Sequence, residues 1–144
     1  MKFKDLKDML RHVEENYGDR TAYILQEKEG KREITHRQFR KDVNSLGTAF
    51  IEMGLKDKRI AIIGENRYEW EVAYLAVAAG TGVVVPLDKA LPENEIESLI
   101  IRSEVEAIVY SSISNFAPDI HNVFRSFPLV TLTRMAEMAA TYIN

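Results

Sequence analysis

The side chains able to do chemistry are few and scattered in this 144-residue sequence. The 3 histidines, His12, His36 and His121, lie too far apart in the sequence to share the i, i+4 spacing of a metal-binding helix. We therefore expect no metal site, and interpret the histidines as surface or helix-capping residues.

Glycine patterns that hold phosphates are also missing from the sequence. There is no G-x-G-x-x-G after a strand pattern, no G-x-x-x-x-G-K-[ST], and no G-x-S-x-G nucleophile elbow. The tripeptide Gly64-Glu65-Asn66 does fall at a predicted strand-to-helix turn, where free backbone N–H groups can bind an anion. Because Glu65 places a negative charge beside them, we favour a structural role, with Asn66 as the helix N-cap and Glu69 completing a capping box.

Lys89 is the candidate binding residue. It follows a predicted strand, and ligands of open α/β sheets bind in crevices outside the carboxyl ends of strands. The alternative is a lysine that is only solvated in an exposed turn. Trp70 could line a ligand cavity but fits the buried stripe of a helix, and the polar side of the helix predicted over residues 35–53 carries Arg37, Arg40 and Lys41.

Composition excludes several classes of protein. With 46% hydrophobic and 28% charged residues the chain is typical of a globular protein, and no apolar segment is long enough for a membrane span. The net charge of −3 gives no electrostatic reason to expect nucleic-acid binding. The absence of cysteine excludes disulfides and thiolate metal sites. We expect a cytoplasmic protein without a secretory signal or a transmembrane segment.

The predicted strands and helices alternate from Arg59 to Ser111. A β-branched run at Ile60–Ile63, a mostly apolar helix ended by a left-handed Gly80, and a second run at Val83–Val85 form a βαβ unit. A helix begins near Pro92, and Ala107–Tyr110 is a third strand. The pattern predicts an α/β fold of three layers, a doubly wound and mostly parallel sheet that is part of a larger domain.

The remaining segments complete the predicted organisation. An amphipathic helix over Phe3–Tyr17 occupies residues 1–20, and residues 21–35 form a hairpin with a longer loop at Glu27–Lys31. A helix runs from a Thr35–Gln38 capping box to Gly54 and opens an α/β core over residues 36–133. Weaker patterns within the core and after it are a helix at Phe116–Phe127, a strand at Leu129–Leu132, and a truncated tail at 134–144 that starts like a helix.

The order of these motifs resembles the N-terminal portion of the adenylate-forming enzymes, and within them the long-chain fatty acyl-CoA synthetases. The resemblance covers about residues 18–111 and rests on a set of ordered features. They are the segment GDRTAYILQ, the Thr-x-x-Gln-Phe helix start at Thr35, the Gly-Glu-Asn-x-x-Glu-Trp segment from Gly64, a helix ending in Ala-Gly, and a Val-Val-Pro-Leu strand before a Pro-Glu turn.

The resemblance implies an ATP-dependent carboxylate–CoA ligase that adenylates a fatty acid and then transfers the acyl group to coenzyme A. The family's phosphate loop, its adenine and ribose contacts and its catalytic lysine lie downstream of these residues. We therefore assign no catalytic residue and no metal ligand. We expect the chain to be inactive alone, with no cofactor bound, although ATP, magnesium and coenzyme A would serve a full-length enzyme. By position, Lys89 would contact a coenzyme A phosphate.

Two further expectations accompany this hypothesis. The alternative function is a free-standing α/β binding or interaction module without catalysis. If later strands and helices of the fold are absent, we expect self-association, because helix surfaces and strand edges meant for those elements would be exposed.

Overall fold

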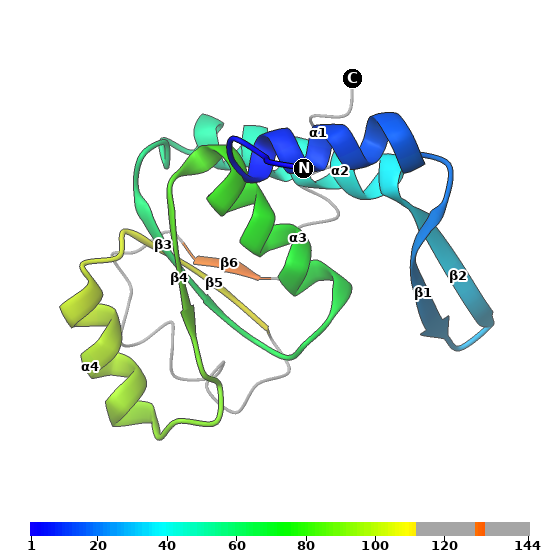
Figure 1. The fold of residues 1–144 in the computed structure, drawn as a ribbon. Helices are drawn as coiled ribbons and strands as arrows, with labels where there is room; N and C mark the ends of the chain where they lie inside the picture. Colours follow the sequence, from blue (N-terminus) through cyan, green and yellow to red (C-terminus); the bar gives the residue numbers. More distant parts are fainter. Residues whose placement is uncertain (112–128, 132–144) are drawn as a thin grey trace.

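A computed structural model of the protein describes residues 1–111 and 129–131. Figure 1 shows a sheet with helices packed around it and a hairpin that projects from this body. The predicted helices at Phe116–Phe127 and from Arg134, and the last residue of the predicted strand Leu129–Leu132, lie outside the described residues. In chain order the elements are α1 (Leu6–Tyr17), β1 (Thr21–Glu27), β2 (Gly30–Thr35), α2 (His36–Glu52), β3 (Arg59–Ile63), α3 (Tyr68–Ala76), the π-helical turn η1 (Val77–Thr81), β4 (Val83–Leu87), α4 (Glu93–Ser103), β5 (Ala107–Tyr110) and β6 (Leu129–Thr131).

The main sheet is parallel and doubly wound, as the sequence predicts. Its strands lie in the order β4-β3-β5-β6. The chain passes from β3 outward to β4 and then returns across β3 to β5, so the winding direction reverses between β3 and β5. In open α/β sheets, ligands bind outside the carboxyl ends of the strands at such a reversal.

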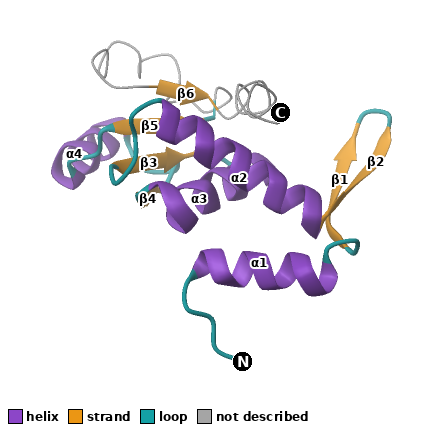
Figure 2. Ribbon diagram, turned by 90° about the horizontal axis from the view of Figure 1, so that it is seen from above, coloured by secondary structure: helices purple, strands orange, loops and turns teal. Residues whose placement is uncertain are grey.

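The three predicted layers are present, because alternate residues of β3 enter different cores. Ile60 and Ile62 pack into a cluster with buried residues of α1, α2 and α3. Ala61 and Ile63 point to the opposite face, where they pack with Ile96 and other residues of α4. Figure 2 shows α4 set apart from α1, α2 and α3. A strand that is buried on both faces requires the uninterrupted apolar run found in β3.

The hairpin of β1 and β2 is held to the body by an aromatic cluster. The ring centroid of Tyr23 lies 5.1 Å from that of Phe39 in α2 and 5.0 Å from that of Tyr68 in α3. The Tyr68 hydroxyl donates to Asp42 at 2.6 Å, and the Tyr23 hydroxyl donates to Glu71. Burial and these carboxylate partners raise the pKa of both phenols. The cluster therefore fixes the hairpin against two helices.

The prediction of a longer loop in this hairpin is wrong. Glu27 pairs directly with Gly30, so only Lys28 and Glu29 form the turn, where the sequence analysis expected a longer loop. Gly30 has a φ of 132°, a region that favours glycine, and this lets the chain re-enter β2 at once.

Helix α2 begins as predicted. The Thr35 hydroxyl accepts a hydrogen bond from the Gln38 backbone N–H at 3.1 Å. The reciprocal half of the capping box is absent, because the Gln38 side chain instead donates to Asp42 at 2.7 Å. Gly54 follows the helix with a φ of 81°, so it provides the predicted left-handed residue after the C-terminus.

Two predictions about α3 are wrong. Its N-cap is Arg67 and not Asn66, and no side chain caps it. Nor does Gly80 end the helix in a left-handed conformation. Its φ is 179°, and the helix continues through η1 to a hydrogen bond from the Gly82 N–H to the Val77 carbonyl at 3.0 Å. The five-residue spacing of that bond is the π-helical pattern.

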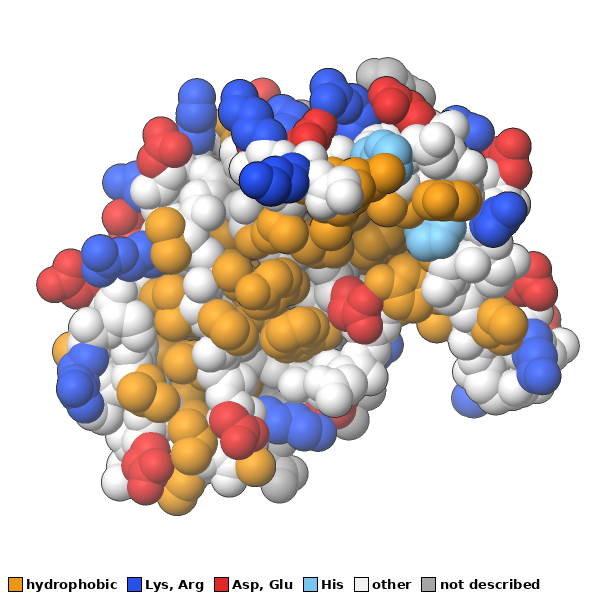
Figure 3. Space-filling view, in the orientation of Figure 1, with side chains coloured by type: hydrophobic (Ala, Val, Ile, Leu, Met, Phe, Trp, Pro, Cys, Tyr) orange, Lys and Arg blue, Asp and Glu red, His pale blue; other side chains and the backbone are white. Residues whose placement is uncertain are grey.

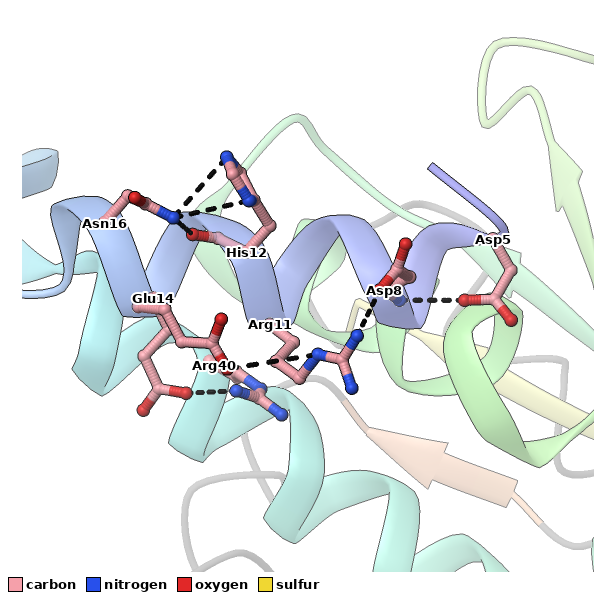
Figure 4. Close-up of polar contacts among 8 residues, drawn as sticks. Asp5, Asp8, Arg11, His12, Glu14, Asn16 and Arg40 are labelled. Atoms are coloured by element: carbon pink, nitrogen blue, oxygen red, sulfur yellow. Dashed lines mark hydrogen bonds and ion pairs between the residues drawn. The ribbon is translucent and has the colours of Figure 1, made fainter. Parts of the chain in front are cut away.

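Helix α1 contributes Leu10 to the larger core, with Met9 packed against it, and is also joined to α2 by polar contacts. Figure 4 shows Glu14 of α1 directed at Arg40 of α2, and the two form a half-buried ion pair. Arg37 of α2 lies 3.1 Å from Asp19 and donates its backbone N–H to Gly18 at 3.0 Å. Both arginines that the sequence analysis assigned to the polar side of α2 thus contact α1 or the turn that follows it.

Candidate functional site

The carboxyl edge of the sheet is the candidate functional site. Ile63 of β3 pairs with Leu87 of β4 and with Tyr110 of β5, so three strands end at the same level. The Ser111 N–H continues this pairing by donating to the Ile63 carbonyl at 3.0 Å. The residues that follow these strands must therefore converge, and they include Glu65, Lys89 and Ser111.

Glu65 is the central charged group of the site. The pKa of its carboxyl lies below the ordinary value, first because of a hydrogen bond with the Ser111 side chain, and further because Lys89 and Arg67 favour the ionised form. Its Oε2 atom is buried and has no hydrogen-bond partner among the described residues. The site thus holds an ionised carboxylate with an unused acceptor.

Lys89 faces this carboxylate from the turn after β4. Its Nζ atom lies 3.8 Å from Oε1 of Glu65, which is too long for a hydrogen bond, and 45% of its side chain is exposed. The Asp88 side chain accepts from the Ala90 N–H at 2.8 Å and so fixes the turn. Lys89 therefore lies at the carboxyl edge of the sheet and remains accessible to an anion from solvent.

Other residues singled out in the sequence lie away from this edge or have structural contacts. Trp70 is half-buried, stacks on Tyr74 with centroids 5.4 Å apart, and packs against the larger core. His12 lies on α1 beside Asn16 (Figure 4), His36 opens α2, and His121 falls outside the described residues. Within the described part of the chain, no group of His, Cys, Asp and Glu could hold a metal ion.

The sequence analysis missed Ser111 as a member of the site. The sequence did contain a signal for Ser111, because this residue directly follows a predicted parallel strand. Asn66 was expected to cap α3 but is exposed and does not. The acidic side chain of Glu65, interpreted as a feature that weakens anion binding, lies 3.8 Å from the Lys89 ammonium group, and its effect on anion binding stays a prediction.

Known structures share this fold. The crystal structure of the anthranilate CoA ligase AuaEII, in complex with anthranoyl-AMP, is similar over 97% of this chain and 28% of that chain, with a TM-score of 0.81 and 16% sequence identity. The similarity defines the class of fold, an α/β unit that recurs as part of larger proteins.

The family follows from the sequence. The pattern of the AMP-binding enzyme family matches residues 10–139, and the chain belongs to that family. Tyrocidine synthase 1 of Brevibacillus parabrevis is 24% identical over 119 residues, which are 81% of this chain and 11% of that protein. Crotonobetaine/carnitine–CoA ligase of Salmonella paratyphi A is 26% identical over 111 residues, 76% of this chain and 22% of that protein. The chain thus spans less than a quarter of these relatives.

The prediction of an adenylate-forming family is confirmed at this level. The relatives include a synthase and a CoA ligase, so the long-chain fatty acid type stays a prediction. None of the helices within residues 1–111 and 129–131 has the length and apolar character needed to cross a bilayer.

Proposed function

We propose that the chain is the N-terminal part of an ATP-dependent carboxylate–CoA ligase that acts on fatty acids. The observation that carries the proposal is the family match over residues 10–139. The similarity to a carnitine–CoA ligase supports a CoA acceptor. In such a reaction a carboxylate oxygen attacks the α-phosphorus of ATP and releases pyrophosphate, and the thiol sulfur of coenzyme A then attacks the acyl carbon and releases AMP.

The role proposed for this chain is to bind and orient a substrate, not to catalyse. Lys89 would contact a phosphate of coenzyme A, and its placement at the carboxyl edge of the sheet with 45% of its side chain exposed supports that role. Glu65 would hold the ammonium group at this edge and would compete with the phosphate for it. ATP and magnesium would bind through residues of a longer protein, so the chain alone would be inactive.

Adenylation is tested by ATP–pyrophosphate exchange, with this chain and with a longer protein that contains it. Fatty acids, an aryl acid and amino acids serve as substrates. We expect exchange only in the longer protein and only with fatty acids. Exchange with amino acids alone would refute the fatty acid assignment, and exchange by the isolated chain would refute its inactivity. No exchange by any form would favour a binding module without catalysis.

The role of Lys89 is tested in the longer protein by the KM for coenzyme A. Lys89→Ala should raise this KM about tenfold, since a hydrogen bond to a charged group is lost. Glu65→Gln should lower it, because the competing carboxylate is removed. Lys56→Ala, at an exposed lysine before β3, is the matched control and should leave the KM unchanged. An unchanged KM in Lys89→Ala would exclude the contact.

We also propose that the isolated chain self-associates in the cytoplasm. Ile101 of α4 is 64% exposed and Val83 of β4 is 54% exposed, which supports association through apolar surface. Figure 3 shows hydrophobic side chains gathered on the face that carries α3 and β4.

The proposed compartment is the cytoplasm, because the absence of cysteine fits a reducing compartment. Light scattering should detect dimers that Ile101→Glu abolishes and that Ile24→Glu, at a similarly exposed hairpin residue, leaves intact. A monomer at high concentration would contradict the proposal.

A further inference from the structure

A hollow lies beside α1, at the end of the sheet opposite its carboxyl edge. It has a volume of about 300 Å³, which is the lower end of the range for small-molecule sites. The residues that line it come from α1, α2 and the segment from α3 through η1, and we call it the α1 groove. They are Lys7, Leu10, Arg40, Val43, Asn44, Gly47, Thr48, Ile51, Leu75, Ala76, Ala79, Gly80 and Thr81. Because η1 precedes β4, the groove lies near the amino ends of the strands, away from Lys89.

The groove exists because small residues face α1. Gly47 and Gly80 have no side chain, and Ala76 and Ala79 have only a methyl group, so the helices do not fill the space between them. A Cβ at Gly47 would make only ordinary contacts, 3.5 Å from the Ala76 carbonyl oxygen. α1 closes the groove with a single buried residue, Leu10. The walls therefore combine apolar residues such as Leu10, Val43 and Leu75 with polar and charged ones.

Of the charged side chains that line the groove, Arg40 is in an ion pair and Lys7 is not. Arg40 is paired with Glu14. The Thr81 hydroxyl donates to the Ala76 carbonyl at 2.9 Å, and the Thr48 hydroxyl donates to the Asn44 carbonyl at 2.9 Å. Lys7, by contrast, forms no ion pair with any described residue.

Asp5 and Asp57 line a neighbouring hollow together with Lys7, but neither they nor Asp8 forms an ion pair with it. Asp8 lies 2.5 Å from Arg11, and these two side chains point toward each other in Figure 4. Asp5 accepts from the Asp8 N–H at 2.8 Å. The positive charge of Lys7 therefore remains available to a ligand at the rim of the groove.

We propose that the α1 groove binds a small amphipathic anion, an alkyl chain that carries one negative head group. The head group lies at Lys7, and the chain packs against Leu10, Val43 and Leu75. A carboxylate and an alkyl phosphate share this chemistry. The site is separate from the carboxyl edge and does not depend on the proposed ligase activity.

The test is a titration of the isotopically labelled chain, followed by two-dimensional NMR, with octanoate below its micellar concentration. Octanoate should shift the amide signals of the groove residues. Octyl phosphate should do the same, and a preference between the two anions identifies the head group. Octanol, which has the chain without the charge, and acetate, which has the charge without the chain, should each bind about tenfold more weakly or not at all.

Variants locate the site. Lys7→Ala should weaken octanoate binding about tenfold, and Lys7→Arg should restore it. Lys41→Ala, at an exposed lysine of α2 outside the groove, should have no effect. Thr48→Trp should block the groove, and because Thr48 is exposed the substitution leaves the core intact. The proposal is wrong if octanoate causes no shifts, if octanol binds equally well, or if Lys7→Ala binds octanoate like the natural sequence.

Discussion

Gly82, at the junction of η1 and β4, offers the sharpest test of the fold. A Cβ atom at this residue would lie 2.1 Å from the carbonyl oxygen of Lys58 and 2.9 Å from its backbone nitrogen. Both are backbone atoms, so no side-chain rotation can relieve the contact. The same Lys58 carbonyl accepts from the Val83 N–H at 2.9 Å, the first hydrogen bond between β3 and β4.

Gly82→Ala must therefore displace β4 from β3 by about an ångström and weaken that hydrogen bond. Overpacking costs about 1–3 kcal/mol, and the hydrogen bond adds about 1 kcal/mol, so we expect a loss of about 2–4 kcal/mol in the free energy of unfolding. For a chain of this size the melting temperature should fall by about 6–12 °C.

Gly80→Ala is the matched control in the same turn. Nothing lies within 4 Å of a Cβ at Gly80, so an added methyl group meets open space. The substitution should change the free energy of unfolding by less than about 1 kcal/mol. Urea and thermal denaturation followed by circular dichroism measure both variants. Equal stability of the two would refute the argument from close approach.

Further predictions concern a helix cap, the core and the carboxyl edge. Thr35→Ala should cost about 1 kcal/mol of stability in urea denaturation, because the Gln38 N–H loses its acceptor, and Thr35→Ser should retain most of it. Phe50→Ala, at a residue with 0% exposure, should cost about 3–5 kcal/mol. The adjacent Ile51→Ala, 41% exposed, should cost less than about 1 kcal/mol, and similar losses at the two positions would contradict the described core. The lowered pKa of Glu65 means that its ionised form stabilises the folded state above the ordinary pKa of 4.5, and that this contribution is lost as the pH falls through the lower folded value. The stability advantage of the natural chain over Glu65→Gln, measured by urea midpoints from about pH 6 to about pH 3, should therefore shrink, and a constant difference would count against it.

The parallel sheet could be predicted because its signals are local. A short β-branched run such as Ile60–Ile63, bounded by glycine, has few alternatives to a buried strand. The Thr35 cap and the Gly54 stop of α2 are likewise set by residues within one turn of each end. Even so, a local signal can misplace a helix boundary by one residue. The N-cap of α3 is Arg67, which has an extended backbone, and not the expected Asn66.

The errors arise where a distant residue decides the conformation. Gly82 is required by the backbone of Lys58 on the neighbouring strand, and nothing in the segment from Val77 to Val83 reveals that contact. The position of Lys89 at the carboxyl edge of the sheet followed from strand order alone. Its contact with Glu65 could not be predicted, because it depends on how two loops after different strands approach each other.

Pro86 has a consequence for how the sheet can be extended. The Val83 N–H faces β3, and because backbone groups alternate along a strand, Val84 and Pro86 face the free side of β4. Proline has no N–H, so within β4 an incoming strand would meet a single donor, that of Val84. Pro86 therefore makes the β4 edge a poorer partner for a further strand, supplied by a longer polypeptide or by a second molecule, than an edge with its full set of donors.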